Sequence, residues 1–463
     1  MNARDDLVID PELLRRFDRP GPRYTSYPTA DRFVEAFGPD AYRVALTNRA
    51  VGGFSRPLSL YVHLPFCNTI CYYCACNKII TKDHGRSAKY IKYLGKEMGL
   101  VTDVIGRGIR LEQLHFGGGT PTFLTREELA ELMRLIGSQF TLTPEGEYSI
   151  EVDPRSTEPE TVRLLASLGF NRISVGIQDF DEDVQRAVNR IQPFEQTEAV
   201  IRAAREAGFK SVNADMIYGL PKQTLANFST TLNKLLLLSP DRIALYNYAH
   251  LPTVFKPQRR IDEAALPSAE TRLDILVQAI RMLTLAGYVY IGMDHFAKPD
   301  DELAQAQRRG HLHRNFQGYS TRAECDLVAL GISAISSLPT AYCQNVKTLD
   351  EYYDALDHGT LPVMRGIQFS ADDLVRRAVI QALMCHFQLS IKSIEIAYLI
   401  DFNRYFAEEL EQLREYREMG LVTLDEEWIT VTPRGRLMVR VVCMVFDRYL
   451  RMAEQRARYS KVI

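Results

Sequence analysis

The chain has 463 residues, a formal net charge of −2 and eight cysteines. Its hydrophobic fraction of 46% and charged fraction of 25% are those of an ordinary globular protein, and its length favours one large domain with a smaller one. The small negative charge argues against a general nucleic-acid binder, which usually carries a basic excess. No apolar run approaches the roughly 20 residues that span a bilayer, and no such run follows Met1, so we expect a cytoplasmic protein without membrane insertion.

The first segment, residues 1 to about 56, is rich in turns, and its distinctive part runs from Gly21 to Thr29. Arg23 and two tyrosines stand there between two prolines, on a stretch that is too stiff for a helix. We interpret the segment as an N-terminal arm. It either packs as part of the structure or acts as a lid whose arginine meets an anionic ligand.

From residue 57 the sequence alternates between strand and helix patterns. The predicted strands are 58–64, 111–116, 147–152, 172–178, 211–218 and 242–248, with helices such as 88–104 and 158–168 between them. Six such units in series predict a parallel sheet with helices outside it, either open or curled into a barrel. The cysteine-rich loop, a triple glycine, Glu151, Gln178, Asp215 and residues 248–250 all fall near the carboxyl ends of strands, where ligands bind in such folds.

After residue 288 the pattern changes. Tyr288–Ala297 predicts a further strand, a polar stretch runs to Tyr319, and the chain turns helical from about residue 365. A small hairpin around 421–432 and a last helix from Arg434 follow. We therefore divide the chain into an N-terminal arm (1–56), a barrel with its extension (57–360) and a mainly helical C-terminal domain (361–463) that caps the barrel mouth.

Four cysteines lie within ten residues directly after the first predicted strand. Closely spaced thiolates hold zinc or an iron–sulfur cluster, and no second cysteine pair or histidine pair completes a usual zinc site here. Cys67, Cys71 and Cys74 offer three ligands to a four-iron cluster and leave one iron open for a substrate group. Cys76 is either a fourth ligand or, as its awkward spacing favours, a residue with another role. The remaining cysteines are scattered, and we expect them to be small buried residues: Cys325, Cys343, Cys385 and Cys443.

The Cys-x3-Cys-x2-Cys spacing, with Tyr73 before the third cysteine, resembles the signature of the radical S-adenosylmethionine (SAM) superfamily. Gly117-Gly118-Gly119-Thr120 after the second strand is similar to the glycine motif of that superfamily. Longer strings resemble one family within it, the oxygen-independent coproporphyrinogen III oxidases, over nearly the whole chain. These strings lie at 22–30, 74–78, 218–222, 247–252, 292–296 and 313–319.

The resemblance implies an α/β fold: a partial (β/α)6 TIM-type barrel with an N-terminal arm and a mainly helical C-terminal domain. It also implies a [4Fe-4S] cluster on Cys67, Cys71 and Cys74, whose open iron takes one SAM. A 5′-deoxyadenosyl radical then takes hydrogen from propionate β-carbons of coproporphyrinogen III. Loss of CO2 from two propionates gives protoporphyrinogen IX in haem biosynthesis.

The family's binding residues match positions of this chain. Arg190 can pair with the methionyl carboxylate, and the carboxylates can take ribose hydroxyls or an ammonium group. Without the resemblance, Glu151 could cap a helix, Arg190 could lie on a surface and Tyr61 could be a core aromatic. The expected contacts of the first SAM are Tyr61, Gly118, Gly119, Thr120, Glu151, Gln178, Arg190 and Asp215, and those of a second SAM are Tyr73, Gly119, Ala249 and Ile335.

The substrate carries several carboxylates, and Arg23 and Arg314 are the candidates to bind them. Cys76 is the candidate catalytic residue, because relatives that do not oxidise the porphyrinogen lack the fourth cysteine and the Arg-Tyr-Thr-Ser-Tyr-Pro arm. Two alternatives are a haem-binding chaperone that keeps the cluster and a radical SAM enzyme that degrades haem. The expected partners are coproporphyrinogen III and a reduced flavodoxin-like or other low-potential electron donor, and the chain is expected to be a monomer.

Overall fold

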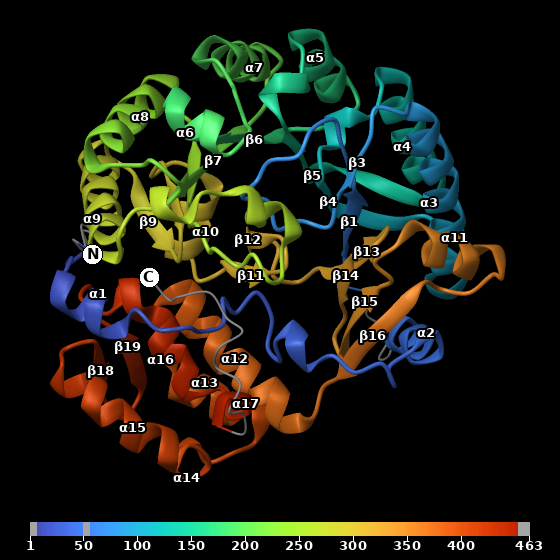
Figure 1. The fold of residues 1–463 in the computed structure, drawn as a ribbon. Helices are drawn as coiled ribbons and strands as arrows, with labels where there is room; N and C mark the ends of the chain where they lie inside the picture. Colours follow the sequence, from blue (N-terminus) through green and yellow to red (C-terminus); the bar gives the residue numbers. More distant parts are fainter. Residues whose placement is uncertain (1–6, 50–55, 452–463) are drawn as a thin grey trace. The chain divides into compact units, whose positions relative to one another are not determined.

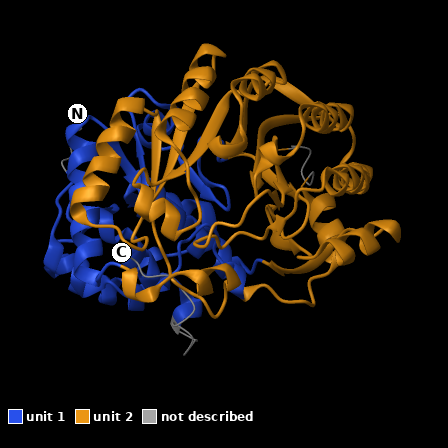
Figure 2. Ribbon diagram, turned by 45° about the horizontal axis from the view of Figure 1, so that its top comes forward, with its two compact units in different colours: residues 1–31, 267–323, 369–463 blue, residues 32–266, 324–368 orange. Residues whose placement is uncertain are grey.

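The computed structural model describes residues 7–49 and 56–451, so residues 1–6 and 50–55 of the predicted arm lie outside the described part. The chain divides into two compact units (Figure 2). Unit 1 comprises residues 1–31, 267–323 and 369–463, and unit 2 comprises residues 32–266 and 324–368. Each unit joins segments that are distant in the sequence. The division into three consecutive segments therefore stays a prediction.

Unit 2 is built on parallel strands that neighbour one another in chain order (Figure 1). All six predicted strands are present, and three of them have the predicted bounds. The strands are β1 (Leu58–Leu64), β4 (Ile109–Gly118), β5 (Phe140–Val152), β6 (Arg172–Gln178), β7 (Ser211–Tyr218) and β8 (Arg242–Asn247). β1 pairs with β4 on one edge and with β13 (Asp326–Leu330) on the other, so the strands form a partial barrel and not a closed ring.

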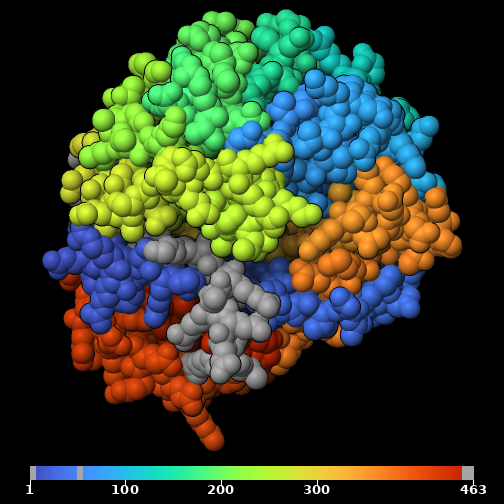
Figure 3. Space-filling view, viewed as in Figure 1, coloured from blue at the N-terminus to red at the C-terminus, as the bar shows by residue number. Residues whose placement is uncertain are grey.

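Helices cover the outer side of these strands (Figure 1), and α5, α7 and α8 make a continuous stretch of surface (Figure 3). The helices are α3 (His84–Ile105), α4 (Arg126–Gln139), α5 (Pro159–Ser167), α6 (Glu182–Ala187), α7 (Phe194–Glu206) and α8 (Leu225–Leu238). α4 shows why these segments are helical. Thr125 and Glu128 form a capping box at its start, and Leu129, Leu132 and Ile136 form the buried stripe that packs inward.

Side chains alternate along each strand between the helix-covered side and the barrel interior. On β1, Leu60 and Val62 are fully buried, whereas Tyr61 and His63 belong to the other face and make polar contacts. The inner face of β1 therefore carries polar side chains. This polarity is the first structural sign of a ligand site at the carboxyl ends of the strands.

An antiparallel extension of the sheet was not predicted from the sequence. It contains β14 (Ile335–Ser337), β15 (Ala341–Asn345) and β16 (Val363–Gln368), beside β13 and helix α11 (Leu349–Asp357). The prediction that the chain turns helical from about residue 365 was wrong by several residues. Val363–Gln368 pairs with β15, and the helix α12 (Ala371–His386) starts only after the capping residue Ser370.

Unit 1 contains the mainly helical C-terminal part of the chain. Its apolar core joins α1 (Pro11–Phe17) and α9 (Ala269–Leu285) to the C-terminal segment through Leu14, Phe17, Leu273 and Val441. Besides α12, the other helices of the described part of this unit are α10 (Glu302–Arg308), α13 (Ile391–Tyr398), α14 (Phe402–Tyr405), α15 (Ala407–Glu418), α16 (Val439–Val445) and α17 (Arg448–Arg451). The predicted hairpin near 421–432 is confirmed as β18 (Val422–Leu424) and β19 (Trp428–Val431).

The predicted single strand at Tyr288–Ala297 is instead a hairpin. β9 (Val289–Gly292) and β10 (His295–Ala297) pair antiparallel, and the chain reverses where Gly292 and Met293 have φ of 143° and 51°. The polar stretch that follows holds a second hairpin of β11 (His313–Asn315) and β12 (Gly318–Ser320). Among the described residues, no helix has both the length and the apolar character needed to cross a bilayer.

Candidate active site

The four clustered cysteines lie in a loop at the carboxyl end of β1. Two short parallel strands, β2 (Phe66–Cys67) and β3 (Ile79–Ile80), close the base of this loop. The amide of Gly119 donates a 2.8 Å hydrogen bond to the carbonyl of Leu64, which joins the end of β4 to the loop. Local backbone pairing therefore holds the cysteine loop and the triple glycine side by side.

Glycine is required at two positions of the triple glycine. A Cβ on Gly119 would lie 2.6 Å from the backbone of Pro65. Gly118 has a φ of 112°, and a Cβ there would lie 2.6 Å from the ring of His63. The backbone can approach the cysteine loop this closely only because both side chains are absent.

A cavity of about 530 Å³ opens at this end of the sheet in unit 2. It brings together most of the residues that the sequence singled out, from the cysteine loop and the ends of β4, β5, β6 and β7. The predicted residues that line it are Cys67, Cys71, Tyr73, Cys74, Cys76, Gly118, Gly119, Thr120, Glu151, Gln178, Arg190 and Asp215.

Arg190 spans the wall of this cavity beside Cys71. Its Nη1 lies 3.0 Å from Oδ2 of Asp153, and its Nη2 donates to the carbonyl of Gly176 at 2.6 Å. Its Nε is buried with no hydrogen-bond partner among the described residues. Because a guanidinium carries five N–H donors, Arg190 keeps donor capacity for a carboxylate ligand.

Asp153 follows β5 and pairs with two arginines. Burial alone would raise its pKa, but the charge of Arg190 and the hydrogen bonds and charge of Arg155 lower the pKa of Asp153 to about 2. The carboxylate is therefore ionised at neutral pH. Arg155 also reaches Cys71, with 3.4 Å between its Nη2 and Sγ of the cysteine.

Glu151 ends β5 and faces the triple glycine. It accepts hydrogen bonds from the amide of Gly118 and from Nε2 of His115, each at 3.2 Å. Burial opposes ionisation, but these donors and the nearby charge of His115 hold the pKa of Glu151 below its ordinary value. Tyr61 is not among the residues that line the cavity, and its ring stacks on His115 with 5.8 Å between centroids.

Asp215 lies on β7 and accepts hydrogen bonds from Ser174 at 2.8 Å and from Asn213 at 2.9 Å. Burial and the nearby charge of Glu151 raise the pKa of Asp215 to about 6. A ligand that donates hydrogen bonds, such as a diol or an ammonium group, would favour its charged form.

Gln178 ends β6 with a φ of 69°, in the left-handed region that glycine favours. The next residue, Asp179, accepts 2.6 Å hydrogen bonds from both Thr231 and Gln223 and a 2.7 Å bond from the amide of Asp181. This buried carboxylate fixes the turn that points Gln178 at the cavity.

Two residues expected at the site of a second SAM accept hydrogen bonds from the same side chain. Gln258 donates to the carbonyl of Tyr73 at 3.0 Å and to the carbonyl of Ala249 at 3.2 Å. Tyr73 also packs against a small apolar cluster that contains Tyr248. Ile335 begins β14 opposite Gln344 and is not among the residues that line the cavity.

The two arginines proposed for the substrate belong to unit 1. Arg23 forms an ion pair with Asp294, and Arg314 donates from Nε to the carbonyl of Arg23 at 3.3 Å. Arg314 also packs over the ring of Tyr319 at 4.7 Å, and its Nη1 is buried with no hydrogen-bond partner among the described residues.

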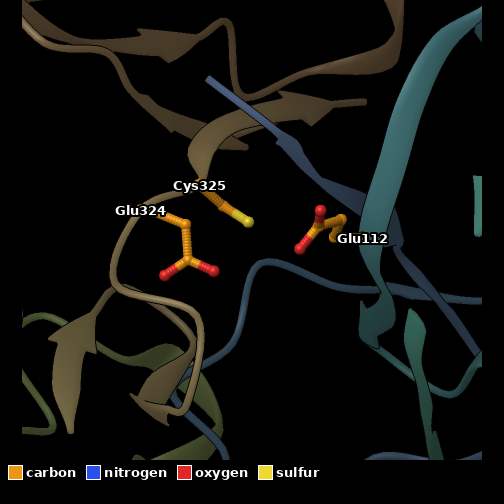
Figure 4. Close-up of side chains that lie close together, drawn as sticks. All are labelled: Glu112, Glu324 and Cys325. Atoms are coloured by element: carbon orange, nitrogen blue, oxygen red, sulfur yellow. The ribbon is translucent and has the colours of Figure 1, made fainter. Parts of the chain in front are cut away.

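A separate group of metal-ligand side chains lies at the amino ends of β4 and β13 (Figure 4). Glu112, Glu324 and Cys325 offer ligand atoms within 4.8 Å of one another. Cys325 is partly exposed there because it precedes β13 on a surface loop, so the prediction that it is buried was wrong. The other three scattered cysteines are buried, as predicted: Cys343, Cys385 and Cys443. Acidic groups gather on surfaces without an ion, so we assign no metal here.

Among the described residues, the loop cysteines form no group as tight as this one. Ligands of a single zinc ion crowd around one centre, whereas ligands of a four-iron cluster stand around a larger body. With three free thiols, an open cavity and the unpaired Nε of Arg190, the site fits an iron–sulfur cluster with a carboxylate ligand.

Sequence reasoning missed four residues that shape the site: Asp153, Arg155, His115 and Gln258. Asp153 and Arg155 directly follow the carboxyl end of β5, so their place in the alternation of strands and helices was an available signal. His115 also had a signal, since it stands two residues before the triple glycine on an inward-facing position. Gln258 had none, because it lies in a short 3-10 helix after β8, η4 (Lys256–Arg260), that no sequence pattern predicted.

Comparison with known families first gives the class of protein to which the chain belongs. The family model described as "Radical SAM superfamily" matches residues 61–235, which span β1 to α8 and contain the cysteine loop and the triple glycine. The "HemN C-terminal domain" model matches residues 369–438 in unit 1. The fold and the site thus define a radical SAM enzyme.

The relatives narrow this class to one family. The chain is 51% identical to the oxygen-independent coproporphyrinogen III oxidase of Pseudomonas aeruginosa over 461 residues, which cover 99% of this chain and 100% of the relative. It is 47% identical to the enzyme of that name from Escherichia coli over 98% of each chain. A solved structure titled "Coproporphyrinogen III oxidase (HemN) from Escherichia coli is a Radical SAM enzyme" superposes with a TM-score of 0.91 over 96% of this chain and 99% of that one. The chain belongs to the oxygen-independent coproporphyrinogen III oxidase family.

Proposed function

We propose that this chain oxidises coproporphyrinogen III without oxygen, converting two propionates to vinyl groups and giving protoporphyrinogen IX. The single observation that carries the proposal is the cavity of unit 2. It places Cys67, Cys71 and Cys74 against the triple glycine, Arg190 and the strand-end carboxylates. Membership of the family, at 51% identity over almost the full length of a relative with this activity in its name, supports the substrate.

The reaction at each propionate is a two-electron oxidation with loss of one carbon as CO2. A hydrogen atom leaves the β-carbon, CO2 leaves the adjacent carbon, and one electron passes to an acceptor, so that a vinyl group remains. When bound, a [4Fe-4S] cluster and SAM supply the hydrogen-abstracting 5′-deoxyadenosyl radical and release methionine. The protein's contribution is binding, orientation and shielding of the site.

The residues of the cavity divide this work by charge. The unpaired Nε of Arg190, and the N–H of its Nη2 that does not bond to Gly176, suit the methionyl carboxylate. Glu151 and Asp215 can accept hydrogen bonds from an ammonium group or from ribose hydroxyls, and Gly118 lets the backbone meet the ligand. Thr120 supports the cluster side of the pocket, since its hydroxyl lies 3.4 Å from Sγ of Cys67.

A second SAM beside the first is part of the proposal. Tyr73, Gly119, Ala249 and Ile335 would line its site, and the hydrogen bonds from Gln258 to the carbonyls of Tyr73 and Ala249 support a common wall. Binding of SAM by equilibrium dialysis to cluster-loaded protein tests the stoichiometry, with two per chain expected.

Arg23 and Arg314 are proposed to bind substrate carboxylates. Arg314 supports the carbonyl of Arg23, and its buried Nη1 lacks a partner among the described residues, so this pair offers guanidinium donors on a braced backbone. A reduced flavodoxin-like or other low-potential protein is proposed as the electron donor. A monomeric state and a cytoplasmic location complete the proposal.

Anaerobic incubation of the reconstituted full chain with SAM, a strong reductant and coproporphyrinogen III tests this function. Protoporphyrinogen IX and two CO2 per substrate are expected. Cys71→Ser should abolish the product, whereas Cys325→Ser, which changes a cysteine at the opposite end of the sheet, should leave it. Tight haem binding without decarboxylation would overturn the proposal in favour of a haem chaperone, and opening of the haem ring would favour a haem-degrading enzyme.

A further inference from the structure

Cys71 differs from Cys67 in the groups that contact its sulfur. Nη2 of Arg155 lies 3.4 Å from Sγ of Cys71, and Nη1 of Arg190 lies 3.6 Å from the same sulfur. Cys67 instead meets the hydroxyl of Thr120, at 3.4 Å. Cys71 is buried, with 8% of its surface exposed, so these contacts are shielded from water.

The two guanidinium groups are held in place by one carboxylate. Asp153 accepts a 2.6 Å hydrogen bond from Nη2 of Arg155 and a 3.0 Å bond from Nη1 of Arg190. It also accepts a 3.0 Å bond from the backbone amide of Arg155, in the turn that follows β5. Two positive charges and one negative charge leave a net positive charge against the sulfur of Cys71.

Arg155 is fixed more firmly than a surface arginine. Its Nε lies 3.0 Å and 3.2 Å from the two oxygens of Asp153, so both carboxylate oxygens accept a hydrogen bond from it. Its side chain is 19% exposed. A planar guanidinium that is held on one edge points its remaining N–H in a defined direction. Here that direction is the sulfur of a proposed cluster ligand.

Hydrogen bonds to ligand sulfurs and nearby charge are two of the ways in which a protein sets the reduction potential of an iron–sulfur cluster. Adding an electron makes the cluster more negative. A neighbouring positive charge and an N–H donor therefore stabilise the reduced form more than the oxidised form. Radical formation from SAM begins with a reduced cluster, so such a group would act directly on the availability of the reactive state.

We propose that Arg155 is a positioning residue for the cluster: its guanidinium donates a hydrogen bond to the sulfur of Cys71 and raises the reduction potential of the cluster. This inference rests on the proposed function, because it requires a four-iron cluster on Cys67, Cys71 and Cys74. It adds a role for a residue outside the proposed SAM set. Arg190 differs in that its donors are also needed for the methionyl carboxylate.

The test compares cluster potentials in the reconstituted full chain, measured by redox titration under anaerobic conditions with absorbance and electron paramagnetic resonance. Arg155→Gln removes the charge and should lower the potential. At the wild-type midpoint, the ratio of reduced to oxidised cluster should fall about tenfold, which is about 59 mV for a one-electron couple. Arg155→Lys keeps the positive charge but loses the planar guanidinium group. Its cluster potential should lie between those of the wild type and Arg155→Gln.

Two control variants distinguish an effect of Arg155 on the cluster potential from a purely structural role of the residue. Arg126→Gln breaks a comparable pair with Glu158, at 2.6 Å, without touching a cysteine, and should leave the potential unchanged. Asp153→Asn removes the negative charge and should raise the potential, opposite to Arg155→Gln. A purely structural role of the network would not give opposite signs.

Each remaining outcome decides a different question. An unchanged potential in Arg155→Gln with four irons per chain would overturn the inference and leave the proposed function standing. Loss of the cluster in both Arg155 variants would also overturn it, since Arg155 would then serve assembly and not potential. A wild-type chain that assembles no four-iron cluster would overturn the proposed function itself.

Discussion

The hydroxyl of Tyr352 donates a 2.5 Å hydrogen bond to the carboxylate of Glu97, which is 2% exposed. The amide of Gly331 and the side-chain amide of Asn345 donate to the same carboxylate, at 2.8 Å and 2.6 Å. Glu97 therefore ties α3 to α11 and to the antiparallel extension. Even with three donors, burial raises the pKa of Glu97 to about 7.

This pKa predicts a dependence of stability on pH. The pKa in the folded state lies above the ordinary value of 4.5, so the folded chain binds the proton more tightly than the unfolded chain does. The stabilisation is fully present below about pH 4.5 and is lost as the pH rises through 7. From the size of this pKa shift, the contribution of Glu97 to the free energy of unfolding should fall by about 3 kcal/mol between pH 4.5 and 8.

Urea unfolding of wild type and Glu97→Gln at pH 5 and pH 8 measures this contribution. The difference in the free energy of unfolding between the two pH values should be smaller in Glu97→Gln, because its amide does not titrate. Glu131→Gln, at an exposed position on α4, should keep the wild-type difference. An equal difference in Glu97→Gln and wild type would show that Glu97 is not the titrating group.

The triple glycine gives a steric prediction. In Gly119→Ala the new Cβ would lie 2.6 Å from the backbone of Pro65, which cannot move without shifting the cysteine loop. The free energy of unfolding should fall by roughly 1–3 kcal/mol, the usual cost of overpacking, and SAM binding should be lost. Gly137→Ala on α4, which has no atom within 4 Å of its Cβ, should instead raise stability by about 0.5–1 kcal/mol. Equal stability of the two variants would contradict the close approach.

The sequence predicted the strands of the barrel well because each has its own boundary signals. Arg172–Gln178 and Ser211–Tyr218 alternate in burial and end at polar or glycine residues, and the structure gives both the same bounds. The antiparallel extension had no such signal. Ile335–Ser337 is three residues long and becomes a strand through pairing with β15, which depends on distant parts of the chain.

The residues of the site also fall into those that the sequence predicts and those that it does not. Cys71 could be found from the spacing of the cysteines and Arg190 from its match to a binding position of the family, and the structure places both on one cavity. The contact of Arg155 with Cys71 joins residues 84 positions apart and follows from the geometry of β5 beside the loop. No local pattern encodes that contact, so only the structure reveals it.

The arginines of unit 1 give a prediction about the substrate. Arg23→Ala removes the partner of Asp294 and a proposed carboxylate ligand, so turnover of coproporphyrinogen III should fall at least tenfold. Cleavage of SAM without substrate should continue, because that step needs only the cluster, SAM and the added reductant. Product analysis by chromatography for both reactions gives the two rates.

The matched control for Arg23 is Arg16→Ala, which breaks an exposed ion pair with Glu415 in the same unit and should leave both reactions intact. Loss of both reactions in Arg23→Ala would point to misfolding and would contradict a role in substrate binding.

Cys76 gives the last prediction. The residue is exposed, whereas Cys71 is buried, and it lines the cavity two residues after Cys74. A thiol at this place can meet a substrate without being a ligand, so Cys76→Ser should keep the iron content and the visible absorbance of the cluster. It should lose porphyrinogen oxidation, measured as protoporphyrinogen IX formed anaerobically. Cys74→Ser should lose the cluster itself. If Cys76→Ser also fails to assemble the cluster, Cys76 is a ligand, and the open position on the cluster must be assigned again.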